Sequence, residues 1–165
     1  MPPETDNLRL EELYGADQSD REKVYSSAEE IEELKRRDFD RRREVVEMMK
    51  LGNVNTSNDL YRAAVIFLHG AEPKEFLTAH RLAVMASING HRQSRWLSAA
   101  SLDRFLMATG LPQVYGTQFE HSEDENRYQL RLPIDDTTVL HFEKRFFGVP
   151  PVVERLAQLN RRIAQ

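Results

Sequence analysis

Five ionisable side chains occupy positions that should face the core of the protein. Residues three and four apart share one face of a helix. In the helix predicted over residues 28–51, two of the five fall on the apolar stripe of Ile31, Leu34, Val45 and Met49, and the other three have mainly apolar neighbours at these spacings in the helices predicted over 73–89 and 92–109. An unpaired charge inside a protein costs several kcal/mol, so we expect the five to converge on one another or on a ligand. They are Asp38, Arg42, His80, Asp103 and Arg104.

A converged set of this kind has the groups that acid–base catalysis and anion binding require. Histidine gains and loses a proton near neutral pH, so we expect His80, with His69 as a second candidate, to be the acid–base group and an aspartate to orient it. A guanidinium binds a carboxylate or phosphate through paired hydrogen bonds, which suits either arginine of the set. The predicted catalytic residues are His80, His69 and Asp103. The same residues could instead form a structural network that only fixes helix packing.

The segment QVYGTQF, residues 113–119, follows the last of these helices and adds polar groups without charge. Gly116 lets the backbone approach a neighbour or a ligand closely. The two glutamines and the threonine suit a polar ligand, but they also suit a hydrogen-bonded plug that seals the helix ends. The predicted ligand-binding residues are Asp38, Arg42, Arg104, Gln113, Tyr115, Thr117 and Gln118.

Other polar residues are assigned to the surface. Arg41 and Arg43 flank the apolar stripe of their helix and are expected on a solvated, charged face. His69, His80 and His91 are evenly spaced, but glycines break the helices between them, and the sequence has no zinc-protease or di-iron motif. We therefore expect no metal and no other cofactor.

Glycines and prolines divide the chain into helices of similar length. The predicted helices cover residues 8–14, 28–51, 57–69, 73–89 and 92–109, followed by one that Asp136 or Thr137 caps and Gly148 ends, and by a closing helix. Residues 127–134 alternate polar and apolar side chains and should pair with 113–119. The expected fold is mainly α: a compact bundle of about six helices, with a helical-hairpin-like centre and a minor two-stranded β hairpin near 113–134. We expect a tail and short helix over residues 1–16 and a single helical domain over 17–165.

The bulk composition narrows the environment and the partners. The 165 residues include no cysteine, which excludes disulfides and cysteine nucleophiles and favours a cytoplasmic protein. The net charge of -4 argues against nucleic acid as a partner. The longest apolar run, AAVIFL, is too short to cross a bilayer, and the N-terminus lacks the pattern of a secretion signal. We expect no membrane partner.

Several segments together resemble a bacterial domain-of-unknown-function family. That family has AA-x-x-F-x-HG, AH-x-LA, WL-x-AA-x-LDR-x-L and PQ-x-YGTQ segments, and the chain has AAVIFLHG, AHRLA, WLSAASLDRFL and PQVYGTQ. The resemblance extends over roughly residues 17–150, and ADQSDR, with Asp17, Gln18 and Arg21, also fits it. It implies a polar signature but no known activity. The implied signature is His69, His80, Asp103, Arg104, Gln113, Gly116, Thr117 and Gln118.

The sequence leaves three functions open. The first is a small enzyme, a hydrolase or transferase, or a ligand-binding domain that takes a small polar or anionic ligand or a peptide. The second is a helical module of tetratricopeptide or Sel1 type that binds a partner protein, with the buried polar residues as scaffold. The weakest is a HEPN-like ribonuclease, because Arg62 and His69 are separated by six residues, as that motif loosely requires.

Overall fold

Most helices begin and end within two residues of the predicted positions. The computed structural model describes residues 5–163, which form seven helices and a two-stranded antiparallel sheet. The helices are α1 (Leu8–Arg21), α2 (Ala28–Lys50), α3 (Ser57–Leu68), α4 (Pro73–Ile88), α5 (Ser94–Ala108), α6 (His141–Phe146) and α7 (Val152–Ile163). The predicted mainly α fold with a small hairpin is confirmed.

Local capping explains the starts of the two central helices. Ser27 accepts a hydrogen bond from the backbone N–H of Glu30, whose carboxylate accepts from the backbone of Ser27 in return. Thr56 and Asp59 form the same reciprocal pair at the start of α3. Such pairs satisfy amides that the first turn of a helix leaves open.

Helix α1 is longer than predicted. It continues through Gly15, where we expected it to end, as far as Arg21. Gly15 lowers the stability of the helix relative to alanine. No neighbouring atom requires a glycine at this position, because nothing lies within 4 Å of where its Cβ would be. Burial of Leu10 and Leu13 on one side, and of Asp17 and Asp20 with their partners, outweighs that cost. The expected boundary between residues 16 and 17 therefore lies inside α1.

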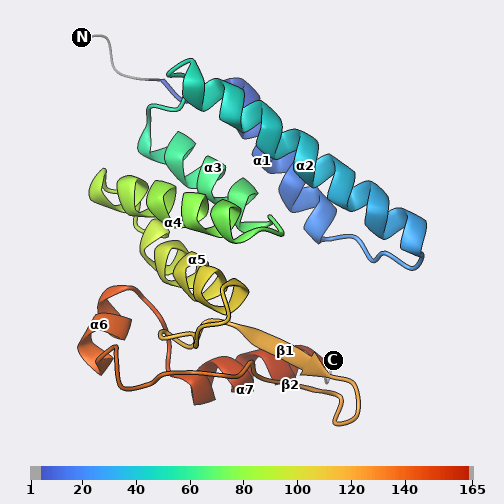
Figure 1. Cartoon of the computed structure of the whole chain (residues 1–165), viewed down its shortest axis with the longest axis vertical. Helices are drawn as coiled ribbons and strands as arrows, with labels where there is room; N and C mark the ends of the chain where they lie inside the picture. Colours follow the sequence, from blue (N-terminus) through green and yellow to red (C-terminus); the bar gives the residue numbers. More distant parts are fainter. Residues whose placement is uncertain (1–4, 164–165) are drawn as a thin grey trace.

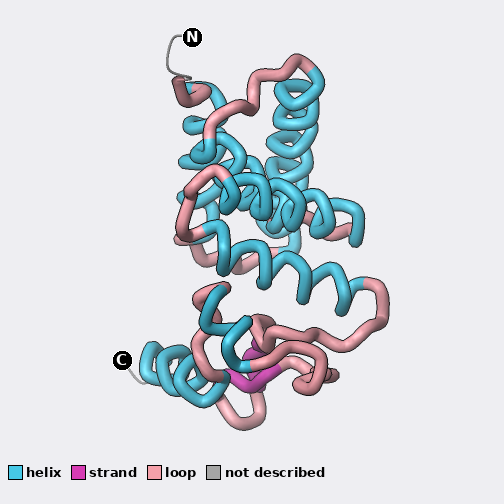
Figure 2. The backbone as a smooth tube through the Cα atoms, turned by 90° about the vertical axis from the view of Figure 1, so that its left-hand side faces the viewer, coloured by secondary structure: helices cyan, strands magenta, loops and turns pink. Residues whose placement is uncertain are grey.

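The molecule has two layers: helices α1 to α5 form the first, and the C-terminal third, from Gln113 onward, forms the second (Figure 1 and Figure 2). Figure 1 shows α1 alongside the long α2, with α3, α4 and α5 following one another as antiparallel neighbours. The packing of α3 on α4, and of α4 on α5, is the most extensive in the molecule. The main core lies between α1, α2, α3, α4 and the start of α5, and includes Leu10, Val45, Ile66, Leu82 and Leu97. Within residues 5–163, every helix is too short or too polar to span a lipid bilayer.

The C-terminal third packs beneath α5. Figure 2 shows the hairpin and the two last helices gathered at one end of the molecule. Strand β1 (Phe119–Ser122) pairs with β2 (Arg127–Leu130), with Phe119 opposite Leu130. A second, smaller apolar cluster of Ala99, Tyr115, Val139 and Val149 joins this part to α5. The second layer thus holds the segment from Gln113 to Gln118 against α5.

Two predicted boundaries in this part are wrong. The hairpin strand starts at Phe119 rather than Gln113. Gln113 forms only an isolated bridge with Ile134, and the amides of Val114, Tyr115 and Thr117 bond to the Asp103 side chain rather than to a neighbouring strand. Helix α6 begins at His141, with Leu140 as its N-cap residue. Asp135, one residue before the predicted cap, instead closes a turn by accepting hydrogen bonds from Thr137 and Thr138, which lower its pKa to about 2.

Candidate functional site

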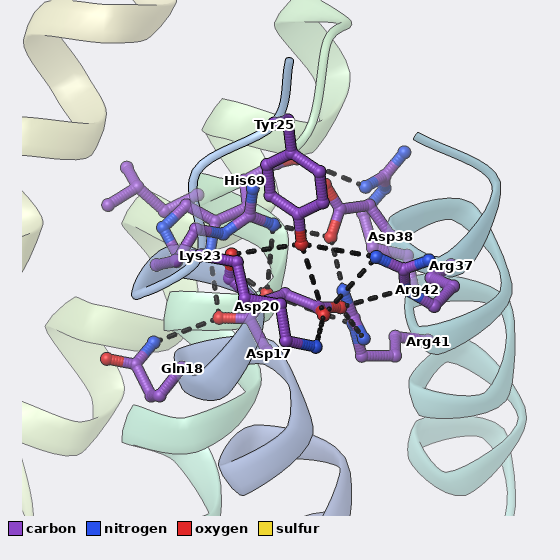
Figure 3. Close-up of polar contacts among 12 residues, drawn as sticks. Asp17, Gln18, Asp20, Lys23, Tyr25, Arg37, Asp38, Arg41, Arg42 and His69 are labelled. Atoms are coloured by element: carbon purple, nitrogen blue, oxygen red, sulfur yellow. Dashed lines mark hydrogen bonds and ion pairs between the residues drawn. The ribbon is translucent and has the colours of Figure 1, made fainter. Parts of the chain in front are cut away.

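The most chemically suggestive contact joins His69, the C-cap residue of α3, to Asp17 of α1. Its Nδ1 atom lies 2.8 Å from Oδ2 and 3.0 Å from Oδ1 of Asp17 (Figure 3). The Asp17 side chain is only 1% exposed, whereas that of His69 is 19% exposed. An ionised carboxylate can only accept, so Nδ1 carries a hydrogen, and in the neutral form of the imidazole the lone pair is on Nε2. This is the arrangement of a general base oriented by a buried carboxylate.

The surroundings of Asp17 keep its carboxylate ionised. Burial alone would raise its pKa, but the hydrogen bond and charge of His69, followed by the charge of Arg21 and the hydrogen bond of Gln18, outweigh burial and lower the pKa below its usual value. Gln18 Nε2 donates over 2.9 Å and Arg21 Nη2 over 3.3 Å. The carboxylate can therefore hold the imidazole in one tautomer at neutral pH.

We expect the contribution of Asp17 to stability to disappear in acid. Its folded-state pKa lies below the unfolded value of about 3.9, so its ionised form stabilises the fold above about pH 5, and this is lost as pH falls through the folded-state pKa. The free energy of unfolding of Asp17→Asn should be about 2 kcal/mol lower than that of wild type near pH 7. That difference should narrow towards pH 3 in urea titrations. A difference that does not change with pH would contradict the assignment.

A network of ion pairs beside this contact ties α1 to α2. Arg41 Nη2 donates to Asp38 over 2.6 Å, and Arg41 Nη1 lies 2.9 Å from Asp20. Arg21 bridges Asp17 and Asp38. Arg37 pairs with Asp20 over 3.0 Å (Figure 3). The carboxylate of Asp38, predicted to bind ligand, is therefore used inside the network.

The solvated position predicted for Arg41 is wrong. Its side chain is 7% exposed, whereas that of Arg43 is 69% exposed, as expected, and pairs with Asp40 over 3.2 Å. Helical spacing placed Arg41 beside the apolar stripe, on the assumption that the partner surface was apolar. That surface is the acidic end of α1, with Asp17 and Asp20, and it covers the side of α2 that carries Arg41.

Arg42 holds the loop that carries His69. Its Nε donates to Glu75 over 2.8 Å and its Nη1 donates to the His69 carbonyl over 3.2 Å. Glu75 also accepts from the amides of Ala71 and Glu72. Gly70 is required here, because a Cβ would lie 2.5 Å from a carboxylate oxygen of Glu75. Arg42 is thus neutralised by a carboxylate, which argues against the predicted ligand contact and for a positioning role.

Asp103 fastens the segment after α5 instead of serving a histidine. Its side chain is fully buried, and its two oxygens accept from the amides of Val114, Tyr115 and Thr117 and from the Thr117 hydroxyl, over 2.7–3.0 Å. Gln113 is also fully buried. It donates to the carbonyls of Gln118 and Arg131 and accepts from the Gln118 amide. These contacts form the hydrogen-bonded plug that the sequence offered as an alternative. The partners of Asp103 therefore do not support its predicted catalytic role.

Tyr115 and Thr117 belong to the same plug. Tyr115 is buried and packs edge-on against Phe147, with ring centroids 5.2 Å apart. The Thr117 hydroxyl donates to Asp103 and accepts from Gln118 Nε2 over 2.9 Å. Ligand contacts were predicted for both, but Tyr115 faces the second apolar cluster, and Thr117 borders the hollow described below only in part.

His80 does not meet the other four residues of the predicted set. Its Nδ1 lies 2.9 Å from the carbonyl of Ser98, which joins α4 to α5. In the part of the chain that the structure describes, no hydrogen bond or ion pair connects any two of the five, so the five do not pair with one another as one of the two predicted outcomes required. Helical spacing identified buried faces correctly, but these faces meet different neighbours. His80 is not among the residues that line the groove described next.

Arg104 is the exception, because it remains without a carboxylate. Its Nε donates to Gln118 Oε1 over 3.1 Å and its Nη1 donates to the Leu68 carbonyl over 2.7 Å. Among the described side chains, no acidic group lies within ion-pair distance of it. Burial, and then the positive charges of Arg21 and Arg131, lower its pKa below the usual value for arginine. A guanidinium in this position attracts an anion.

Three adjoining hollows run from His69 past Arg104, and we call them together the arginine groove. The first, of about 500 Å³, shares Leu68 and Trp96 with the second, of about 190 Å³. The second shares Arg104, Gln118 and Phe119 with the third, of about 380 Å³. The basic side chains that line the groove are Arg21, His69, Arg104, Arg131 and Arg155. Among the described residues no aspartate or glutamate lines it, although the chain as a whole is acidic.

The sequence alone gave little reason to select Asp17 and Arg21. Because the first helix was expected to end at Gly15, helical periodicity made no prediction about the burial of these two residues. Only the segment ADQSDR, through the family resemblance, pointed to these residues. A helix continued to Arg21 would have placed Asp17 on the same face as Leu10 and Leu13.

Comparison of the chain with known protein families, with curated proteins and with solved structures gave no match. Within residues 5–163, no three histidine, aspartate or glutamate side chains are grouped so as to hold a metal ion. The function therefore has to be inferred from the groove itself.

Proposed function

We propose that the arginine groove binds an anionic ligand with a phosphate or carboxylate group, and that His69 acts on this ligand as an acid–base catalyst. The observation that carries the proposal is the unneutralised charge of Arg104. This guanidinium donates a hydrogen bond to the carbonyl of Leu68, the residue before His69. The positive charge of Arg21 is near enough to lower the pKa of Arg104. An anion drawn to Arg104 therefore comes close to the histidine.

The reaction class that suits these groups is hydrolysis or group transfer. Nε2 of His69 takes a proton from water or from an acceptor hydroxyl as that oxygen attacks the phosphorus or carbonyl carbon. The imidazolium, held by Asp17, then returns the proton to the leaving oxygen as its bond breaks. Arg104 and Arg21 offset the negative charge that develops on the attacked group.

We expect Arg104→Met to weaken anion binding by about 10- to 100-fold, the size of a hydrogen-bonded charge contact. Inorganic phosphate and pyrophosphate are the probes, titrated calorimetrically at low salt. Arg43→Met is the matched control, because it removes an exposed arginine from another surface and should leave the affinity unchanged. Wild-type protein that binds neither probe, or equal affinities for wild type and Arg104→Met, would contradict the proposal.

Exposed apolar side chains near α6 favour a second candidate, the helical interaction module. They are Leu132, Leu140, Phe142 and Phe146. The ion pairs of Asp38 and Arg42 and the hydrogen bonds of Asp103 also suit a scaffold. If the anion probes fail to bind, this candidate becomes the better one.

The ribonuclease alternative has less support. Arg62 lies 2.9 Å from Asp6, 3.3 Å from Glu11 and 3.8 Å from Asp59, whereas His69 pairs with Asp17. The arginine and the histidine of the loose motif thus serve different contacts at different ends of α3.

A further inference from the structure

We infer that the ligand of the arginine groove is a nucleotide, with its base against Trp96 in the first hollow and its phosphates beyond Trp96, beside Arg104 and Arg155. This inference rests on the proposed function and adds the identity of the ligand class. It comes from a part of the groove that anion binding does not use, the wall of the first hollow.

The residues that line the first hollow suit a flat, largely apolar group. Its walls are the aromatic rings of Tyr61 and Trp96 and the aliphatic side chains of Val65, Leu68 and Leu97. The Trp96 side chain forms part of both the first and the second hollow, and the residue is 39% exposed. The volume of about 500 Å³ lies in the usual range for small-ligand sites. Free phosphate or a simple sugar phosphate would leave the Trp96 ring without a stacking partner.

The position of Tyr61 is fixed by its own neighbours. Its ring stacks on His91 with centroids 4.1 Å apart, and it lies 6.1 Å from Tyr14. Burial, and then the nearby Tyr14, raise its pKa to about 12, so the phenol stays uncharged at neutral pH. A neutral wall suits an uncharged base better than a second anion.

Two amides at the edge of this hollow match the edge of a base. Gln18 and Gln93 both line it. Gln18 Nε2 already donates to Asp17, so its Oε1 remains to accept from an exocyclic amino group. Aromatic stacking with hydrogen bonds from amides to the base edge is the usual way proteins hold an unpaired base.

The basic side chains beyond Trp96 provide for more than one phosphate. The second hollow lies between Trp96 and Arg104, and its lining also includes Arg155. The third adds Arg131 on the far side of Arg104. A base in the first hollow therefore has guanidinium groups along the continuation of the groove, which favours a nucleoside diphosphate over a monophosphate.

Trp96 is the sole tryptophan of the chain, so its fluorescence reports directly on the first hollow. We would titrate wild-type protein with ADP, GDP, CDP and UDP, and with pyrophosphate and ribose 5-phosphate. At least one nucleoside diphosphate should quench Trp96 and bind about tenfold more tightly than pyrophosphate, as expected for one stacked base. Ribose 5-phosphate should bind without this gain.

Variants separate the two halves of the ligand. Trp96→Leu should lower the nucleotide affinity about tenfold, measured calorimetrically, and leave pyrophosphate binding unchanged. Trp96→Phe, which keeps a ring, should retain most of the affinity. Arg104→Met should weaken both ligands.

Three results would overturn the inference. Pyrophosphate could bind as tightly as every nucleotide, Trp96→Leu could leave nucleotide affinity intact, or a single-stranded tetranucleotide could bind more tightly than all four diphosphates. In each of them the anion site survives as long as pyrophosphate binding still depends on Arg104. Failure of pyrophosphate to bind at all overturns the proposed function as well.

Discussion

Replacing Asp103 by alanine should destabilise the protein by about 3–5 kcal/mol. The substitution leaves four donors in the 114–117 segment, three amides and one hydroxyl, without the buried carboxylate that accepts from them. Each unsatisfied buried donor costs about 1–3 kcal/mol, reduced where water can enter. Because the second layer is joined to α5 largely through this segment, the loss should appear in urea denaturation followed by circular dichroism.

Two matched variants make the Asp103 experiment specific. Asp103→Asn keeps the shape and one accepting oxygen but turns an NH₂ group towards the donors of Thr117, so we expect about half the loss. Asp124→Ala removes an exposed aspartate from the hairpin loop and should change stability by less than about 0.5 kcal/mol. A loss below about 1 kcal/mol for Asp103→Ala would show that the segment is not held by this carboxylate.

Replacing Arg41 by methionine should destabilise the protein by about 3 kcal/mol. The change leaves Asp38 and Asp20 with one cation fewer in a buried setting, and breaking one side of a buried ion pair costs about 3–5 kcal/mol. We place the effect at the low end because Arg21 and Arg37 still face the two carboxylates. In addition, Arg41 Nε has no hydrogen-bond partner among the described residues and lies 3.9 Å from Asp17, so its removal breaks no hydrogen bond.

Arg43→Met is the control for Arg41, two residues further along the same helix. Its exposed pair with Asp40 should be worth less than about 1 kcal/mol. A double-mutant cycle of Arg41→Met with Asp38→Asn should show coupling of about 1–2 kcal/mol in chemical denaturation. Equal losses for Arg41→Met and Arg43→Met would contradict the structure of the network.

The sequence by itself determined where helices form and which of their faces are buried. Ser27 with Glu30, and Thr56 with Asp59, mark helix starts through contacts three residues apart, which spacing reveals directly. The burial of Asp38 and Asp103 followed from their apolar neighbours one turn away, and both are buried. These properties are local, and so a single sequence contains them.

Only the tertiary structure decided what the buried polar groups contact. His69 pairs with Asp17, 52 residues earlier, and Arg104 meets the carbonyl of Leu68, 36 residues earlier. Helical periodicity gives the direction of a side chain but not the identity of the surface opposite, because that depends on how several helices pack at once. For this reason Asp38, Arg42 and Asp103, which are buried, and His80, which is partly buried, make separate contacts. Among the described residues the same packing left Arg104 without a carboxylate partner, and the proposed site depends on this unpaired positive charge.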